Sequence, residues 1–306
     1  MYNKIEFGDC RETMRRWVAD GVNVQTCVTS PPYFGLRDYG HDGQIGLEQT
    51  PEEYIKAMVE VFRCVWDVLK DDGTLWLNIG DSYATNRKYQ VPSTNVARKH
   101  SESQSAGGRG STVPNGMKPK DLIGIPWMLA FALRADGWYL RQDIIWHKPN
   151  PMPESVRDRC TKAHEYIFLM SKSQKYYYDA NAIKDPVKQD WGTRDRDNGK
   201  YHNEGSGLQP HSGLEKSYET ANKRSVWTVN TKPYSGAHFA VYPQELIQPC
   251  ILAGAPKGGV VLDPFMGSGT TAQVAQNLGR QYLGCELNPE YSELQHERTK
   301  QFALGI

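Results

Sequence analysis

The sequence predicts an α/β fold in which a mostly parallel, seven-stranded sheet is covered by helices on both faces. Short runs of β-branched and apolar residues alternate with amphipathic stretches, and one buried run near the C-terminus leads through a glycine-rich turn into a helix. Strands that alternate with helices are typical of parallel sheets, because a parallel crossover usually contains a helix. The expected strands cover residues 4–7, 24–29, 74–79, 139–146, 166–170, 259–263 and 281–286.

Two helix starts are marked by capping residues. Thr50 can cap the stretch "PEEYIKAMVEVFRCVWDVLK", with Pro51 at the first helical position and Glu53 completing a capping box. Asn288 followed by Pro289 predicts a second start. Both signals place helices between or after predicted strands, as the fold class requires.

Composition favours a cytoplasmic protein that does not contact a membrane. The 306 residues carry a net charge of only +1, so contacts with nucleic acid must come from local basic patches. The six cysteines form no C-x-x-C pair and are expected to be reduced thiols rather than metal ligands. The N-terminus does not resemble a signal peptide, and no apolar run approaches membrane-spanning length.

Two stretches break the alternation of strands and helices. Residues 84–120 contain seven Lys/Arg against one Glu, a net +6, with almost no aliphatic residues. Such a stretch is expected to be a disordered surface loop, a mobile loop that closes over a polyanion, or both. Residues 184–233 mix nine basic and seven acidic residues with scattered aromatics, which favours an inserted recognition region.

The glycine-rich turn indicates a nucleotide-type cofactor. The strand that contains Val260 ends at Asp263, passes Gly267-Ser268-Gly269 and opens a helix, and the next strand ends at Glu286. In such units glycines allow close approach of a ligand, and the acidic residue accepts hydrogen bonds from ribose hydroxyls. The turn is not a P-loop, because no Gly-Lys-Ser/Thr follows. An ordinary tight turn between a strand and a helix is the other interpretation.

A second unusual segment, "TSPPY", follows the strand at 24–29. Neither proline can donate a backbone hydrogen bond, so the chain leaves the sheet in a rigid, extended conformation. That conformation holds the Ser30 hydroxyl, the Pro31 carbonyl and the Tyr33 ring in place. It is either a rigid turn or a preorganised site.

Taken together, "TSPPY" and "DPFMGSGTT" resemble the exocyclic-amino DNA methyltransferases that use S-adenosylmethionine. The catalytic motif precedes the cofactor loop, an order that resembles the circularly permuted β class. The stretches "GDC", "DIIWHKPNPMPESVRDRCTKAHEYIFLMSKSQKYYYD" and "HFAVYPQELIQPCI" are similar to further parts of that class. The resemblance covers roughly residues 1–83, 121–180 and 234–306 and implies a Rossmann-like methyltransferase fold.

The resemblance also implies site residues. The Ser30 oxygen and the Pro31 carbonyl would accept the two amino hydrogens of a base, Pro32 would keep the segment rigid, and Tyr33 would stack on a base flipped out of the duplex. Phe265 would pack on the adenine of the cofactor. Residues expected to bind the cofactor are Asp9, His238, Asp263, Phe265, Gly267, Ser268, Gly269, Thr270 and Glu286.

The domain assignment follows from the order of the motifs. Residues 1–183 are expected to form the catalytic half of the methyltransferase domain, 184–233 a target-recognition region and 234–306 the cofactor-binding half. Double-stranded DNA is the expected partner, and its phosphates would be met by the 84–120 loop and by a basic patch of Lys148, Arg157, Arg159 and Lys162. A restriction endonuclease could accompany the enzyme, and the chain could be a monomer or a homodimer.

Several alternatives remain open. In this family Ser-Pro-Pro-Tyr tends to accompany N4-cytosine methylation, and Asp- or Asn-Pro-Pro-Tyr tends to accompany N6-adenine methylation, so cytosine is favoured over adenine. Pro249-Cys250 raises a covalent C5-cytosine mechanism, but its helical apolar context favours a buried helix residue. Methylation of glutamine in proteins and DNA binding without catalysis are more distant hypotheses.

Overall fold

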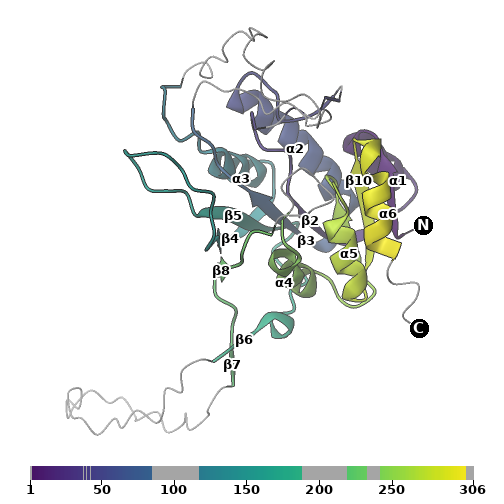
Figure 1. Ribbon diagram of the computed structural model, residues 1–306. Helices are drawn as coiled ribbons and strands as arrows, with labels where there is room; N and C mark the ends of the chain where they lie inside the picture. Colours follow the sequence, from purple (N-terminus) through teal and green to yellow (C-terminus); the bar gives the residue numbers. More distant parts are fainter. Residues whose placement is uncertain are drawn as a thin grey trace, which may run out of the picture.

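The computed structural model describes residues 2–36, 38, 40–41, 43–84, 117–187, 219–232 and 242–300. In these residues eight strands form one sheet in the order β1-β10-β9-β2-β3-β5-β4-β8, with helices on both faces (Figure 1). Seven of the strands lie where the sequence predicts them: β1 (Lys4–Phe7), β2 (Val24–Thr29), β3 (Leu69–Ile79), β4 (Tyr139–His147), β5 (His164–Ser171), β9 (Val260–Asp263) and β10 (Gln281–Glu286). The predicted α/β class is confirmed.

The sheet is mixed at one side. Strands β1, β10, β9, β2 and β3 are parallel, β5 runs antiparallel to both β3 and β4, and β8 (Val226–Thr228) pairs parallel with β4. The predicted number of seven strands is therefore wrong by one. A three-residue strand is too short to show periodicity in the sequence. Because β8 falls within 184–233, part of the predicted recognition region belongs to the main sheet.

The helices pack on the two faces of the sheet through two separate hydrophobic clusters. One cluster holds side chains of α1 (Cys10–Ala19), α2 (Pro51–Val68) and α3 (Ile125–Ala135), and the other holds side chains of α4 (Gln244–Gly254) and α5 (Thr270–Asn277). On β2, Cys27 packs into the first cluster and Val28 into the second. This alternation makes a central strand buried on both sides, as expected for a doubly covered sheet. Helix α6 (Ser292–Lys300) packs against α5.

Both predicted helix starts are present. The Thr50 hydroxyl accepts from the Glu53 backbone N–H at 3.2 Å, and a Glu53 carboxylate oxygen accepts from the Thr50 backbone N–H at 3.1 Å. Asn288 caps a short 3-10 helix (Pro289–Tyr291) directly before α6. The local signals therefore fixed where these helices begin.

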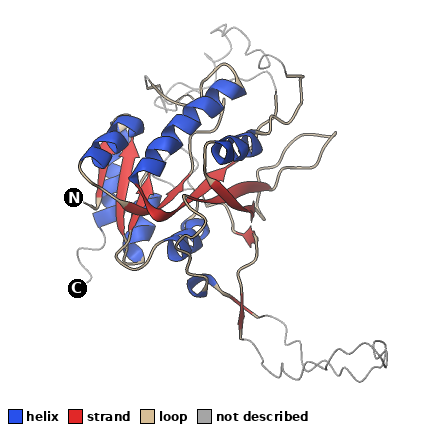
Figure 2. Ribbon diagram, turned by 180° about the vertical axis from the view of Figure 1, so that it is seen from behind, coloured by secondary structure: helices blue, strands red, loops and turns tan. Residues whose placement is uncertain are grey.

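The remaining short elements lead away from the sheet. A 3-10 turn (Asn181–Ile183) precedes β6 (Asp185–Pro186), which pairs with β7 (Thr220–Ala221) as a narrow ribbon that projects from the body of the molecule (Figures 1 and 2). The central parts of two predicted segments, 85–116 and 188–218, lie outside the described residues, as does His238. Within the described part of the chain, no helix is long and apolar enough to cross a membrane.

Candidate functional site

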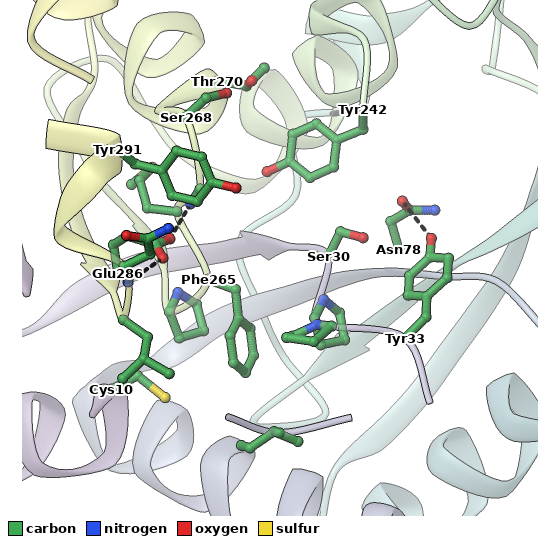
Figure 3. A pocket seen from close by; sticks show the side chains of 18 of the residues that line it. Cys10, Ser30, Tyr33, Asn78, Tyr242, Phe265, Ser268, Thr270, Glu286 and Tyr291 are labelled. Atoms are coloured by element: carbon green, nitrogen blue, oxygen red, sulfur yellow. Dashed lines mark hydrogen bonds between the residues drawn. The ribbon is translucent and has the colours of Figure 1, made fainter. Parts of the chain in front are cut away.

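A cavity of about 540 Å³ opens where several parallel strands end. Ser30 follows β2, Phe265 follows β9, Glu286 ends β10 and Asn78 lies near the end of β3, and all four line the cavity (Figure 3). The carboxyl ends of parallel strands are the usual location of ligand sites in open α/β sheets. The sheet therefore brings the two motifs singled out in the sequence, more than 200 residues apart, to one pocket.

The glycine-rich turn forms one wall of this pocket. Gly267 and Gly269 have φ of 54° and 90°, a left-handed conformation that other residues adopt at a cost. A Cβ on Gly269 would lie 3.3 Å from the Cα of Gln295, so α6 packs closely against the turn. Ser268 is 4 % exposed, and its hydroxyl has no hydrogen-bond partner among the described residues. A buried, unpaired hydroxyl beside an open cradle fits a polar ligand.

Glu286 anchors the turn from the neighbouring strand. Its Oε2 accepts from the Gly267 N–H at 2.7 Å, and its Oε1 accepts from the Asn288 N–H at 2.8 Å (Figure 3). Burial raises the pKa of Glu286 from 4.5 to about 7, although these backbone donors oppose the shift. A carboxylate that lines a cavity with such a pKa is a typical ligand-binding group.

Asp263 has a different position from the one expected. It is 1 % exposed and does not line the cavity. Its Oδ1 accepts from the Thr29 hydroxyl at 2.6 Å and from the Phe265 N–H at 3.0 Å. Its Oδ2 accepts from the hydroxyls of Tyr242 (2.9 Å) and Thr271 (2.5 Å). Asp263 therefore ties together the segments around Thr29, Phe265, Tyr242 and Thr271, and both of its oxygens accept hydrogen bonds from the protein itself.

Three other predicted cofactor residues line the cavity. Phe265 is half-buried, and its ring projects into the pocket in Figure 3. Thr270 begins α5, and its hydroxyl accepts from the buried Arg298 guanidinium. Asp9 caps α1, where it accepts from the Arg11 N–H at 2.7 Å and forms an ion pair with the Arg11 side chain. Arg11 holds the pKa of Asp9 below its ordinary value.

The Ser30–Tyr33 segment forms the opposite wall. Pro31 and Pro32 both line the cavity, and the buried Tyr54 hydroxyl donates to the Pro32 carbonyl at 2.9 Å, which fixes the segment against α2. The Tyr33 hydroxyl donates to Glu165 Oε2 at 2.7 Å. Burial and the Glu165 carboxylate raise the pKa of Tyr33 well above 10, whereas a hydrogen bond with Ser30 lowers it. The phenol is therefore neutral and held at its far end.

Several residues that the sequence motifs did not assign to the cavity also line it, among them Asn78, Trp146, Lys148, Glu165 and Tyr242. Asn78 lies near the end of a predicted strand, and that position could have identified it. Glu165 and Trp146 are opposite each other on β5 and β4, an antiparallel pair. Because that pairing depends on tertiary structure, no local signal reveals the contact of Glu165 with Tyr33.

The predicted basic patch is largely paired within the protein. Lys162 donates to the backbone carbonyl of Asp81 at 2.6 Å, and Arg159 forms an ion pair with Glu154 at 2.6 Å. Lys148 forms an ion pair with Glu165 inside the cavity. Only Arg157 of the four is exposed. These four residues therefore do not form the predicted patch of free cations for DNA phosphates.

Asp81 and Cys250 both have structural roles. Asp81 accepts from the Gly124 N–H at 2.9 Å and the Ile125 N–H at 3.1 Å, so it caps the start of α3. Cys250 is 1 % exposed within α4, and burial raises the pKa of its thiol. A neutral, enclosed thiol does not act as a nucleophile. The interpretation of Cys250 as a buried helix residue is confirmed. No cluster of potential metal ligands occurs in the described ranges.

Comparison with known proteins identifies the family. Residues 24–297 match the family model described as DNA methylase, of the N6/N4 methyltransferases. The chain is 49% identical over 295 residues to type II methyltransferase M.SmaI of Serratia marcescens, covering 96% of this chain and 90% of that protein. It is 48% identical to M.Cfr9I of Citrobacter freundii over 294 residues, covering 96% and 86%.

Solved structures share the fold. The chain matches PvuII DNA methyltransferase (cytosine-N4-specific) with a TM-score of 0.62 and 18% identity, covering 97% of this chain and 86% of that one. The M1.HpyAVI complex with S-adenosylmethionine gives a TM-score of 0.55 at 16% identity, covering 96% and 98%. The expected Rossmann-like methyltransferase fold is confirmed. With the pocket and its motifs in place, the chain belongs to the N6/N4 family of S-adenosylmethionine-dependent DNA methylases.

Proposed function

We propose that this protein transfers a methyl group from S-adenosylmethionine to the N4 amino nitrogen of a cytosine flipped out of double-stranded DNA. The observation that carries the proposal is the position of Ser30, which faces the same cavity as the Gly267–Gly269 turn (Figure 3). A single cavity with a rigid hydroxyl on one wall and a ligand cradle on the other suits transfer between two bound molecules.

The cofactor would occupy the wall built by the glycine turn. When bound, S-adenosylmethionine supplies an electrophilic methyl group. Glu286 would accept hydrogen bonds from its ribose hydroxyls, the unpaired Ser268 hydroxyl would bond a polar group, and Phe265 would pack on its adenine. Gly267 and Gly269, which carry no side chain, would allow the cofactor to approach the backbone closely. Thr270, at the start of α5, would close this side of the site. Asp9 would act through the start of α1, which it caps, and Asp263 would hold the pocket wall in place through its hydrogen bonds.

The base would occupy the other wall. An exocyclic amino group is a poor nucleophile, because its lone pair is delocalised into the ring. The Ser30 oxygen and the Pro31 carbonyl would accept its two hydrogens and favour a nitrogen with a directed lone pair. Pro32, bonded to Tyr54, keeps this segment rigid, and Tyr33 presents its ring to the base. Base–aromatic stacking typically contributes roughly 1–3 kcal/mol.

Cytosine is proposed over adenine because Ser30 is a neutral acceptor, as in the Ser-Pro-Pro-Tyr members of the family. N6-adenine methylation by the same fold is the second candidate. The family match favours DNA as the methyl acceptor over protein glutamine. We also propose that 184–233 contributes to target recognition and 84–120 to phosphate contact. We further propose that the enzyme is cytoplasmic and acts as a monomer or a homodimer. A cognate restriction endonuclease would accompany it.

Nucleoside mass spectrometry tests the proposed reaction. Unmethylated DNA would be incubated with the protein and isotopically labelled S-adenosylmethionine, and then digested to nucleosides. Label in N4-methylcytosine is the expected result. Label in N6-methyladenine would keep the fold and mechanism but reject the base, and label in 5-methylcytosine would reject the mechanism.

A further inference from the structure

An ion pair between Glu165 and Lys148 lies beside the Tyr33 hydroxyl, in the wall that would face the base. Glu165 accepts from the Tyr33 hydroxyl through Oε2, and its Oε1 accepts from the Lys148 ammonium. The Lys148 Nζ lies 4.2 Å from the centroid of the Trp146 ring. Asn78 reaches the same carboxylate, 3.4 Å from Nδ2 to Oε2. All five side chains line the cavity.

This group is partly removed from water and rigidly held. The side chains of Lys148 and Glu165 are 18% and 15% exposed. Desolvating two charges is unfavourable, so such a pair is not explained by stability alone. The backbone N–H of Lys148 donates to the Ala163 carbonyl at 2.8 Å, which fixes the chain just beyond β4. A Cβ on Gly80 would lie 2.8 Å from Tyr33 Cε2 and 3.2 Å from Glu165 Cδ, so only glycine permits this approach without a shift.

We propose that Lys148 reads the target base. Its ammonium, oriented by Glu165 and Trp146, would donate to the ring nitrogen N3 and the carbonyl O2 of the cytosine whose amino group meets Ser30. Lys148 is then a specificity-determining residue and Glu165 a positioning residue. This inference rests on the proposed cytosine reaction and deepens it.

The chemistry of the two amino bases explains the preference. Beside its amino group, cytosine presents two consecutive acceptors, N3 and O2. Adenine presents one acceptor, N1, followed by a C–H that accepts no hydrogen bond. An ammonium with several N–H groups is satisfied by the first edge and left partly unpaired by the second. A site built from buried polar groups rejects a ligand that leaves them unpaired.

A matched pair of lysine variants tests the inference. Lys148→Met removes the donor and retains most of the length of the unbranched side chain. Lys172→Met is the control. The Lys172 side chain is 16% exposed, and its Nζ lies 3.5 Å from an Asp71 carboxylate oxygen and 5.7 Å from the centroid of the Trp66 ring. Lys172 comes directly after the last residue of β5, whereas Glu165 lies near the first residue of that strand. Lys148→Gln, which keeps a neutral donor, is a second test variant.

We expect Lys148→Met to lower kcat/KM for N4-methylcytosine formation by roughly 10- to 100-fold. The share of N6-methyladenine should rise, while the Kd for S-adenosylmethionine stays at the wild-type value. Lys148→Gln should lie between, and Lys172→Met should match the wild type. If Lys148→Met retains cytosine methylation within about twofold of the wild type, the inference is wrong.

A double-mutant cycle separates base reading from support of Tyr33. Tyr33→Phe breaks the hydroxyl contact with Glu165 and retains the ring. If Lys148→Met causes no further loss in the Tyr33→Phe background, Lys148 acts only through Tyr33, and the inference is overturned. A wild-type enzyme that forms no N4-methylcytosine rejects the proposed function itself, a failure seen without any variant.

Discussion

The two walls of the cavity are built in different ways. The cofactor wall is largely continuous in the chain: β9, the glycine turn, α5 and β10 follow one another, and backbone N–H groups and glycine conformations shape it. The wall proposed to hold the base combines side chains from β3, β4 and β5 with the segment that follows β2, and Glu165 is located 132 residues from the Tyr33 that it holds. The cofactor wall therefore depends mainly on local sequence, whereas the wall proposed for the base depends on the pairing of separate strands.

The largest expected effect is on the base wall. Ser30→Ala removes one preorganised acceptor and should lower kcat by roughly 100- to 1000-fold, with S-adenosylmethionine affinity unchanged. Ser173→Ala is the matched control, because its hydroxyl bonds the backbone carbonyls of Asp71 and Lys175, just beyond the end of β5 that lies away from Glu165. Single-turnover methylation and equilibrium cofactor binding measure the two quantities. Equal losses in both would show that the walls are not separable.

A smaller effect is expected on the cofactor wall. Gly269→Ala places a Cβ at a φ of 90° and 3.3 Å from Gln295 Cα, so the turn must shift. Left-handed backbone costs other residues roughly 1–2 kcal/mol, and cofactor affinity should therefore fall about tenfold. Gly279→Ala also has a positive φ of 70°, but its neighbour is the flexible Lys257 side chain, away from the cavity. Calorimetric titration should show a cofactor defect in the first variant alone.

The smallest expected effect is a pH dependence set by Glu286. Its raised pKa of about 7 means that the cofactor-free protein is increasingly protonated there below neutral pH. An ionised carboxylate accepts hydrogen bonds from ribose hydroxyls more strongly than a protonated one does. Cofactor affinity should therefore rise as pH increases through about 7. Glu286→Gln should weaken binding and remove this rise, and the exposed Glu293→Gln should retain it.

The same group affects stability in the opposite direction. An unfolded chain ionises Glu286 near its ordinary pKa of 4.5, whereas the folded protein does so near 7. The free energy of unfolding of the cofactor-free protein should therefore fall as pH rises between these values. Urea titrations across this window, with and without Glu286→Gln, measure the contribution. An identical slope in both proteins would show that Glu286 does not carry it.

The sequence by itself determined the parts of this protein that local chemistry fixes. Seven strands, the capping box at Thr50 and the glycine turn were predicted, because periodicity, caps and φ preferences act within a few residues. The glycine turn together with the preceding TSPPY motif, in that order, was enough to indicate the family and its cofactor. The rigid Ser30–Tyr33 segment was also readable, since prolines restrict the backbone wherever they occur.

Only the tertiary structure decided which side chains face the cavity. Asp263 turned inward because Thr29, Tyr242 and Thr271 reach it from separate segments. Lys148 turned toward Glu165 rather than toward solvent, because β4 and β5 pair in a register that places them together. The direction of a side chain depends on partners that are distant in the chain, and strand pairing, not local pattern, brings those partners within reach.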